Sequence, residues 1–342
     1  MDTRILGTDD KGITEAARIL KEGGLVAFPT ETVYGLGANA MDDEAVSKVY
    51  AAKGRPSDNP MIVHVAKPQD LTLLTDNITD DMKKLAENFW PGPLTMVVQA
   101  KPQVSRITTG GLDTVAVRIP DNETTLKLIE TAGMPLAGPS ANLSGHPSPT
   151  SSNHVYDDLQ GRIDAVIQGE ICKVGIESTV VDMTSPAPVI LRPGIVTAED
   201  LEKVLGKKVE LDPAVLQKPK ISNNGKLLET EDDYKPKAPG MKYKQYAPKA
   251  EMMIFVGEPE KVRLAIAAEK MARVEFGQKV GVLIFDSDKP KEAAHDFFAQ
   301  LRAFDKSGVD VILAAALKED GVGLAVMNRM FKSAGYNIRE VE

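Results

Sequence analysis

Four cationic side chains lie where predicted strands or helices meet loops. Lys53 and Arg55 flank a glycine at the end of a predicted helix, and Arg118 and Arg192 each end a predicted strand. Taken singly, each has an ordinary explanation, such as a solvated helix end, a surface ion pair or a turn. Together they predict a site for a polyphosphate anion, because lysine and arginine form charge-assisted hydrogen bonds with phosphate. Hydroxyl-bearing residues of nearby predicted turns suit the same site: Thr30, Thr32, Ser140, Ser144, Ser148, Ser178 and Thr179.

The other chemistry-bearing residues do not indicate a covalent mechanism. His64 lies in an apolar strand, which on general grounds is more typical of a half-buried structural histidine. Cys172 is the single cysteine and is interpreted as a buried, inert thiol. The sequence contains no nucleophile elbow with a Ser-His-Asp order, no suggestively spaced carboxylate pair and no Walker A loop. We therefore expect catalysis by positioning and charge rather than by a protein nucleophile.

Residues 25–65 contain the elements that must position these side chains. An apolar strand runs into a turn rich in hydroxyls and glycines, a short helix then ends at Lys53, and a second strand brings back His64. In open α/β sheets, this order places loop side chains at the carboxyl ends of strands, where ligands usually bind. Residues 35–40 weakly resemble a dinucleotide-binding fingerprint, but glycines that permit a tight turn are the favoured interpretation.

The whole chain predicts an α/β protein in three parts. Residues 1–212 alternate between strands and helices and are expected to form a catalytic domain. Residues 213–248 are rich in Lys, Pro, Asn and Gly and predict a linker. Residues 249–342 contain three successive strand–helix units, which predict a smaller parallel sheet with helices on its faces.

Composition and charge narrow the class of protein. A length of 342 residues suggests about two domains, and a net charge of −8 argues against a surface that broadly binds nucleic acid, although a local basic patch is compatible with it. One cysteine allows no intrachain disulfide, and four histidines without cysteine partners give no metal-ligand spacing. The sequence shows neither a signal peptide nor an apolar run of membrane-spanning length. We therefore expect a soluble, cytoplasmic protein with no membrane contact.

Many segments, in order, resemble the threonylcarbamoyl-AMP synthase family in its long, two-domain form, whose catalytic domain is called YrdC-like. The family signature K-x-R paired with S-x-N corresponds here to Lys53, Arg55, Ser140 and Asn142. The resemblance implies a twisted mixed sheet with helices, followed by a smaller Rossmann-like parallel α/β domain. The matching segments are PTETVYGLGANA (29–40), KGRP (53–56), NPMIVHV (59–65), WPGPLT (90–95), DTVAVRIP (113–120), PSANLSG (139–145), IESTVVD (176–182), ILRPG (190–194), PGMKYKQYAP (239–248) and GLAVMNRM (323–330).

The resemblance implies a nucleotidyltransferase that converts L-threonine, bicarbonate and ATP to threonylcarbamoyl-adenylate and pyrophosphate. Other proteins then transfer the threonylcarbamoyl group to tRNA, so that machinery, and tRNA itself, are implied partners. Mg²⁺ is implied together with ATP, with no protein side chain assigned as its ligand. By resemblance, the catalytic residues are Lys53, Arg55, Ser140 and Asn142; threonine is held by Thr32, His64, Arg118, Gly138 and Ser178; and ATP is held by Arg55, Asn59, Thr114, Ser140, Ser148, Arg192, Tyr243 and Tyr246.

Three positions depart from the family pattern. Ala238 stands where the linker usually has serine, and Gln245 stands where it usually has histidine, which puts a hydroxyl or imidazole role there in doubt. Gly138 replaces a commoner alanine, and we expect this difference to have little effect on the fold or the site.

Two alternative functions stay open. One is a module that binds double-stranded RNA or tRNA, and the other is a carbamoyltransferase of the hydrogenase-maturation type, against which the lack of a cysteine-rich zinc module argues.

The linker is interpreted as an active-site lid rather than a passive tether. Met241, Tyr243 and Tyr246 lie among Lys242 and Lys244. Exposed aromatic residues are unfavourable unless they pack on something, and neighbouring lysines suit a nucleotide. A lid over the first domain would exclude water from a labile mixed anhydride.

Overall fold

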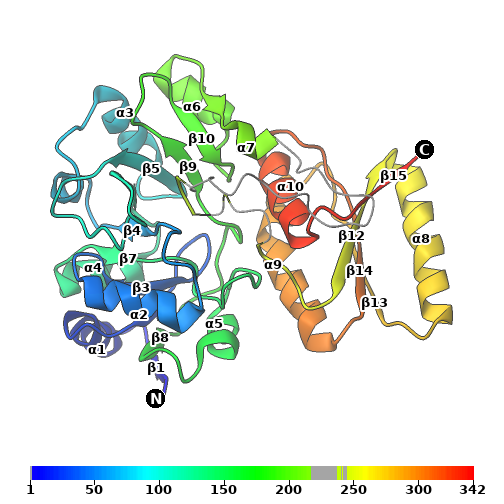
Figure 1. Cartoon of the computed structure of the whole chain (residues 1–342), viewed down its shortest axis with the longest axis horizontal. Helices are drawn as coiled ribbons and strands as arrows, with labels where there is room; N and C mark the ends of the chain where they lie inside the picture. Colours follow the sequence, from blue (N-terminus) through cyan, green and yellow to red (C-terminus); the bar gives the residue numbers. More distant parts are fainter. Residues whose placement is uncertain (1, 217–236, 240, 242–244) are drawn as a thin grey trace.

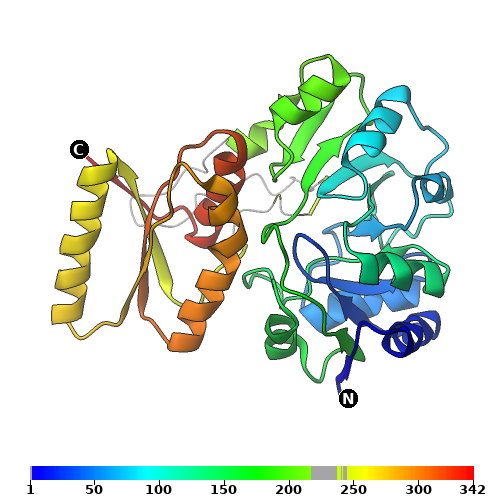
Figure 2. The same cartoon turned by 180° about the vertical axis from the view of Figure 1, so that it is seen from behind.

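Two α/β domains lie side by side in the computed structural model, which describes residues 2–216, 237–239, 241 and 245–342. The first, larger domain carries the N-terminus, and the second, smaller domain carries the C-terminus at its far end (Figure 1). The view from behind shows the same arrangement (Figure 2). The α/β class predicted from the sequence is confirmed.

The first domain is built on one mixed sheet of short, largely buried strands. These strands are β1 (Arg4–Leu6), β2 (Val26–Phe28), β3 (Gly35–Asn39), β4 (Ile62–His64), β5 (Leu94–Gln99), β6 (Thr114–Arg118), β7 (Leu136–Ala137), β8 (Ala165–Ile167), β9 (Thr179–Asp182), β10 (Val189–Arg192) and β11 (Glu210–Leu211). Among the described residues they lie in the order β1-β8-β2-β3-β7-β4-β6-β5-β9-β10-β11. β4 runs parallel to β6, whereas β5 runs antiparallel to it. Strands far apart in the sequence are therefore neighbours, and the loops that follow them meet.

Helices pack on this sheet through one apolar face. They are α1 (Asp10–Lys21), α2 (Asp43–Lys53), the 3-10 helix η1 (Pro68–Leu73), α3 (Asp80–Phe89), α4 (Glu123–Ala132), α5 (Ser152–Leu159), α6 (Ala198–Leu205) and α7 (Pro213–Leu216). In α1, Ile13, Ala16 and Leu20 are buried, as their helical spacing predicted. The short helix α7 occupies the first four residues of the predicted linker.

Helix α2 is placed by its two ends. Asp42 caps the start, because its Oδ1 accepts hydrogen bonds from the backbone N–H groups of Glu44 (3.0 Å) and Ala45 (3.3 Å). Gly54 ends the helix in the left-handed conformation, at φ 62°. Lys53 is therefore the last helical residue, and its side chain leaves the helix toward the loop that follows β7.

Residues 35–39 form strand β3 rather than the predicted tight turn. The strand pairs antiparallel with β2. A Cβ atom on Gly35 or Gly37 would lie only 2.7 or 2.9 Å from the ring of Phe28. These glycines therefore make room for a buried aromatic ring. The predicted tight turn is wrong, and the weak resemblance to a dinucleotide-binding fingerprint has no support, because the glycines lie within a strand.

The second domain is a parallel sheet with helices on both faces. Its elements are β12 (Glu251–Gly257), α8 (Pro259–Glu275), β13 (Val280–Leu283), α9 (Pro290–Ser307), β14 (Val311–Ala315), α10 (Gly321–Ser333) and β15 (Ile338–Val341). The strand order is β13-β14-β12-β15, and each neighbouring pair is parallel. The three predicted strand–helix units are confirmed. The sequence did not predict β15, whose two central residues are charged and exposed.

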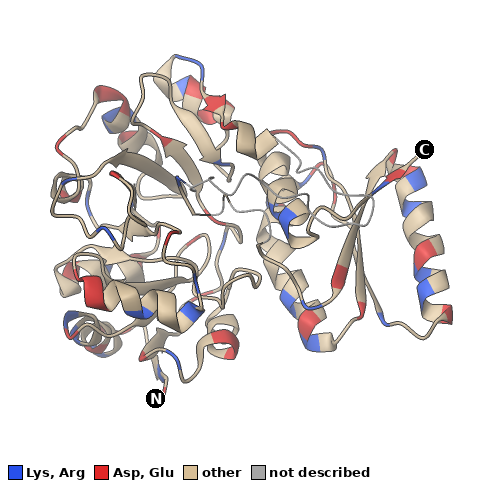
Figure 3. Cartoon of the chain, in the orientation of Figure 1, with Lys and Arg blue, Asp and Glu red and all other residues tan. Residues whose placement is uncertain are grey.

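Helices α9 and α10 lie between this sheet and the first domain, whereas α8 covers the outer face (Figures 1 and 2). Phe297 and Phe298 of α9 share an apolar cluster with Val33 and Ile176 of the first domain. Lys, Arg, Asp and Glu are interspersed on the helices of both domains (Figure 3). None of the described helices combines the length and the apolar character that crossing a bilayer requires.

Candidate active site

One pocket of the first domain collects most of the residues singled out in the sequence. It lies where β4 and β6 end and where the loops after β2 and β7 approach the segment before β9. Twelve of the fifteen site residues implied by the resemblance line it: Thr32, Lys53, Arg55, Asn59, His64, Arg118, Gly138, Ser140, Asn142, Ser178, Arg192 and Tyr246. The predicted hydroxyl residues Thr30 and Ser144 line it as well.

Of the other three implied residues, two lie elsewhere. Ser148 is buried directly behind the pocket, where its Oγ donates a hydrogen bond to Glu177 Oε1 (2.5 Å). Thr114 begins β6, whereas Arg118 ends it, so the two are about 13 Å apart along the strand at about 3.3 Å per residue. Tyr243 lies outside the described residues. Their assignment to ATP stays a prediction.

Part of the pocket is lined by three basic side chains that are buried or half-buried, Lys53, Arg55 and Arg192. Lys53 is buried, and its Nζ donates hydrogen bonds to the backbone carbonyls of Ser140 and Asn142. Arg55 donates to the carbonyl of Pro60 (2.9 Å). Burial, and the nearby charge of Arg55, hold the pKa of Lys53 well below its usual range. The Lys53 amine thus fixes the loop that carries the S-x-N motif.

Arg192 joins this part of the pocket to the segment before β9. Its Nε donates to the carbonyl of Ser178 (3.0 Å), its Nη2 to Ser178 Oγ (3.2 Å), and its Nη1 to the carbonyl of Pro239 (3.3 Å). Burial lowers the pKa of Arg192 to about 10, so the guanidinium stays charged at neutral pH. A fixed positive charge therefore lies against the Ser178 hydroxyl and the end of the linker.

Another part of the pocket is formed where β4 and β6 end together. His64 pairs with Arg118 across these parallel strands. Arg118 Nη1 donates to Thr32 Oγ1 (2.9 Å), and its Nη2 forms a buried ion pair with Glu31 Oε2 (2.5 Å). Burial and the neighbouring Arg118 lower the pKa of His64 to about 3, so the imidazole is neutral at physiological pH.

Several pocket atoms are buried without a hydrogen-bond partner among the described residues. They include Asn59 Oδ1, His64 Nδ1 and Asn142 Oδ1. Buried polar groups in folded proteins are almost always hydrogen-bonded, and an exception calls for an explanation. All three residues line one pocket, so a polar ligand is the explanation we favour.

Gly138 leaves the space that the imidazole occupies. A Cβ atom at this position would lie 2.8 Å from His64 Nδ1 and 2.8 Å from Phe28 Cζ. Both neighbours are ring atoms of buried side chains. The expectation that glycine and alanine are nearly equivalent here is therefore wrong for this chain, because alanine would displace a ring.

Two buried glutamates were missed as site residues, although both lie in segments that carried the family resemblance. Glu177 lines the pocket, and its carboxylate accepts hydrogen bonds from Ser148 and from Arg329 of α10. Glu31 supports Arg118. A hydroxyl-and-cation search overlooks carboxylates, and only the folded chain brings Arg329 to Glu177. By contrast, Cys172 is buried as expected, and burial raises the pKa of its thiol to about 12.

The described end of the linker reaches the pocket. Pro239, Gln245 and Tyr246 belong to its lining. Met241 is buried in an apolar cluster with strand residues of the first domain. The Tyr246 ring packs against Phe298 of α9, with the ring centroids 5.2 Å apart. The linker is thus in contact with both domains.

The described residues contain no group of three or more histidine, cysteine or acidic side chains that could hold a metal ion. Both carboxylate oxygens of Glu177 already accept hydrogen bonds from protein donors. The side chains present therefore do not fit a dedicated protein cage for Mg²⁺. Mg²⁺ bound mainly through substrate phosphates is compatible with them.

A pocket that combines basic side chains, a neutral imidazole and hydroxyls at strand ends of a mixed sheet is typical of an α/β enzyme. Such a pocket suits the activation of a small polar substrate by a nucleotide, without a protein nucleophile. Residues 18–194 match a protein family described as "Telomere recombination", and residues 196–335 match "Threonylcarbamoyl-AMP synthase, C-terminal domain".

Relatives and a solved structure agree over nearly the whole chain. The threonylcarbamoyl-AMP synthase of Pyrococcus abyssi is 48% identical over 336 residues, 95% of each chain. That of Bacillus subtilis is 43% identical over 347 residues, 96% of this chain and 95% of its own. The crystal structure of P. abyssi Sua5 complexed with L-threonine superposes with a TM-score of 0.91 at 46% identity, covering 99% of this chain and 100% of the other. The chain belongs to the threonylcarbamoyl-AMP synthase family.

Proposed function

We propose that this chain joins L-threonine, bicarbonate and ATP into threonylcarbamoyl-AMP, with release of pyrophosphate. The product supplies the threonylcarbamoyl group for threonylcarbamoyladenosine in tRNA. The observation that carries this proposal is one pocket lined both by Lys53, Arg55 and Arg192 and by His64 and Arg118. The first group suits a triphosphate, and the second suits a small amino acid that carries a hydroxyl.

The reaction needs two bond-forming steps. The threonine amine attacks the carbon of bicarbonate, and loss of water leaves a carbamate. A carbamate oxygen then attacks the α-phosphorus of ATP, and the bond to the departing pyrophosphate breaks with its electron pair on oxygen. Threonine, bicarbonate and ATP thus give threonylcarbamoyl-AMP, pyrophosphate and water. Neither step needs a protein nucleophile, so positioning and charge stabilisation are the tasks left to the chain.

Each group of pocket residues has a separate task in this proposal. Thr32, His64, Arg118 and Ser178 bind threonine, with Gly138 giving room beside the imidazole. A neutral imidazole can accept or donate one hydrogen bond without adding charge next to the reacting amine. ATP is bound by a second set of residues, and the resemblance adds Thr114 and Tyr243 to it. The set comprises Lys53, Arg55, Asn59, Ser140, Asn142, Ser148 and Arg192.

Positive charge near the phosphates would stabilise the transition state, in which negative charge shifts toward the leaving pyrophosphate. Arg55 and Arg192 provide it, since a guanidinium matches phosphate oxygens with two donors at once. Lys53 contributes by holding the Ser140–Asn142 loop. Mg²⁺, entering with ATP, would neutralise phosphate charge.

The linker end would close this site. Tyr246 and Gln245 line the pocket, and burial raises the pKa of Tyr246 to about 12, so its hydroxyl is neutral. We propose that this segment retains ATP and shields the mixed anhydride from water. The product would then pass to the proteins that modify tRNA, and we place the activity in the cytoplasm on that ground.

Isotope transfer tests the proposal. Full-length protein incubated with ATP, threonine and ¹⁴C-labelled bicarbonate should yield a labelled product that contains adenosine, separable by chromatography. Label that stays in bicarbonate while ATP is consumed would contradict the assignment.

A further inference from the structure

Two arginines of the second domain reach into the first domain beside the pocket. Arg302 comes from α9 and Arg329 from α10. Their side chains are only 11% and 0% exposed. Buried guanidinium groups are costly unless they are paired and hydrogen-bonded, so their partners show what they hold.

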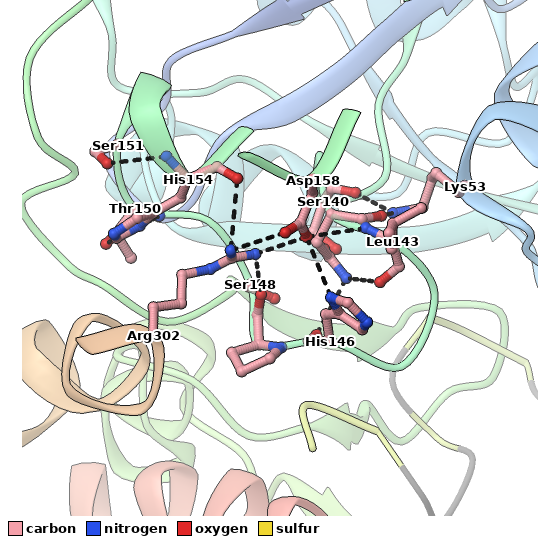
Figure 4. A network of polar contacts seen from close by, with 12 residues as sticks. Lys53, Ser140, Leu143, His146, Ser148, Thr150, Ser151, His154, Asp158 and Arg302 are labelled. Atoms are coloured by element: carbon pink, nitrogen blue, oxygen red, sulfur yellow. Dashed lines mark hydrogen bonds and ion pairs between the residues drawn. The ribbon is translucent and has the colours of Figure 1, made fainter. Parts of the chain in front are cut away.

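Arg302 holds the loop that leads out of the S-x-N motif. Its Nη1 and Nη2 lie 3.0 and 2.9 Å from the two carboxylate oxygens of Asp158, a bidentate pair. Nη2 also donates to the carbonyl of Pro147 (2.6 Å), and Nη1 donates to that of His154 (3.4 Å). Figure 4 shows the guanidinium reaching from α9 to these groups beside Ser148.

Asp158 passes this restraint to the motif itself. Its Oδ2 accepts a hydrogen bond from the backbone N–H of Leu143 (3.1 Å) and lies 3.7 Å from His146 Nδ1. Burial alone would raise the pKa of Asp158, but hydrogen bonds from His146 and Arg302 hold it below its usual range. The side-chain amide of Asn142 in turn donates to the carbonyls of Leu143 and His146. One chain of contacts therefore runs from α9 to Asn142.

Arg329 makes the same kind of contact with the other loop of the pocket. Its Nε pairs with Glu177 Oε2 (3.1 Å), and its Nη1 donates to the carbonyl of Pro193. Glu177 directly precedes Ser178 in the sequence, and Pro193 directly follows Arg192. The second domain thus restrains both loops that bear hydroxyl and cationic pocket residues.

A plain domain-joining ion pair would need only Arg302 and Asp158. The added bond to Pro147, whose carbonyl directly precedes Ser148, and the onward bond from Leu143 have no role in such a pair. We propose that Arg302 is a positioning residue through which the second domain sets the ATP-binding part of the pocket. This inference rests on the proposed function in one respect only, the assignment of this loop to ATP.

Loss of Arg302 should therefore weaken binding of ATP and spare threonine. The residues assigned to threonine are held by the contacts of Arg118 with Thr32 and Glu31, and among the described residues these contacts do not involve this loop. A displacement of about 1 Å in a group that positions a substrate can lower the catalytic rate about a hundredfold. We expect Arg302→Ala to raise the Kd for the nucleotide at least about tenfold.

Calorimetry on the full-length chain tests this expectation. The probes are α,β-methylene-ATP, which cannot release pyrophosphate, and L-threonine. Arg302→Ala, Arg302→Lys and Asp158→Asn should each raise the Kd for the nucleotide analogue and leave that for threonine within about twofold. The matched control is Arg273→Ala, which removes an arginine paired with Glu269 on the outer helix α8, far from the pocket. It should change neither Kd.

Thermal unfolding of each variant separates positioning from stability. Arg302→Ala that binds both probes like the wild type would overturn the proposal, as would an equal loss of both. Where Arg302→Ala does not fold, the charge-neutral pair Arg302→Met with Asp158→Asn replaces it, and normal nucleotide affinity in that folded pair would also overturn the proposal. A wild-type chain that binds the analogue but makes no threonylcarbamoyl-AMP would contradict the proposed function alone.

Discussion

Burial decides what each charged side chain of the pocket can do. Burial lowers the pKa of Arg192 to about 10, and it also lowers the pKa of Arg55. Burial and Arg118 lower the pKa of His64 to about 3. The pocket therefore combines fixed cations with an imidazole that carries no charge. Such a site binds anions without depending on protonation of its histidine near neutral pH.

Arg55 is the residue from which we expect the largest effect on the chemical step. Arg55→Ala should lower kcat/KM for ATP by about a hundredfold or more, because a preorganised charge stabiliser is lost. Arg55→Lys keeps a charge but loses the fork of donors, so it should recover only part of the rate. Pyrophosphate release measures the rate, and thermal unfolding checks that the chain is folded. Activity per folded molecule that survives in Arg55→Ala would show that the residue is structural.

His64 makes stability depend on pH in a defined direction. Its pKa is about 3 in the folded chain and 6.5 in the reference state, so between these values the unfolded chain binds more protons. The free energy of unfolding should therefore fall as pH falls below 6.5. His64→Gln should make this dependence shallower between about pH 7 and pH 5. Urea unfolding at several pH values measures the slopes.

A histidine at the surface serves as the control for this measurement. His295 is 46% exposed on α9, so His295→Gln should keep the wild-type slope. Equal slopes for His64→Gln and the wild type would mean that the imidazole is not buried neutral in the folded chain.

At the scale of elements, three of the segments that line the pocket are the loop after β7, the segment before β9 and the end of the linker. The first is tied to Lys53, and the second to Arg192. Tyr246 belongs to the third and lies between the pocket and Phe298 of α9. Its ring therefore connects the pocket lining to the second domain.

Tyr246 gives a test of the lid at this scale. Tyr246→Ala removes the ring that lines the pocket, so it should speed escape of ATP or of the intermediate and lower kcat/KM by about tenfold. Tyr246→Phe keeps the ring on Phe298 and should stay close to the wild type. Rapid-quench measurement of released intermediate distinguishes the two variants. Identical retention in Tyr246→Ala and the wild type would contradict a lid.

Local sequence signals predicted the elements whose causes are local. Asp42 and Gly54 fix helix α2, and strand–helix alternation gave the second domain. Strand β3 was missed because its glycines are explained by a tertiary contact. They leave room for the ring of Phe28. Helix α5 was missed because it is short and buries only Val155 and Leu159.

The site divides in the same way. The ordered motifs identified twelve of the pocket residues, since each motif carries its own chemistry. Arg302 gave no signal, because it stands in the amphipathic helix α9. Arg329 lies in the matching segment 323–330, but that segment did not indicate its partner. Their partners Asp158 and Glu177 are 144 and 152 residues away. Only the packing of α9 and α10 on the first domain brings these charges together.

At the scale of the whole molecule, the two domains share a buried interface. Val33 and Ile176 of the first domain are buried in the same apolar cluster as Phe297 and Phe298 of the second. Two buried ion pairs cross the same boundary. The second domain therefore supports the pocket from behind, and the linker contributes to its lining.

The central claim is that one pocket couples threonine and bicarbonate to the cleavage of ATP. The most direct test is pyrophosphate release by the full-length chain, with threonine and bicarbonate omitted in turn and with serine replacing threonine. We predict release only when ATP, threonine and bicarbonate are all present, and much slower release with serine, which lacks the methyl group. Equal release without bicarbonate, or with serine, would contradict the claim.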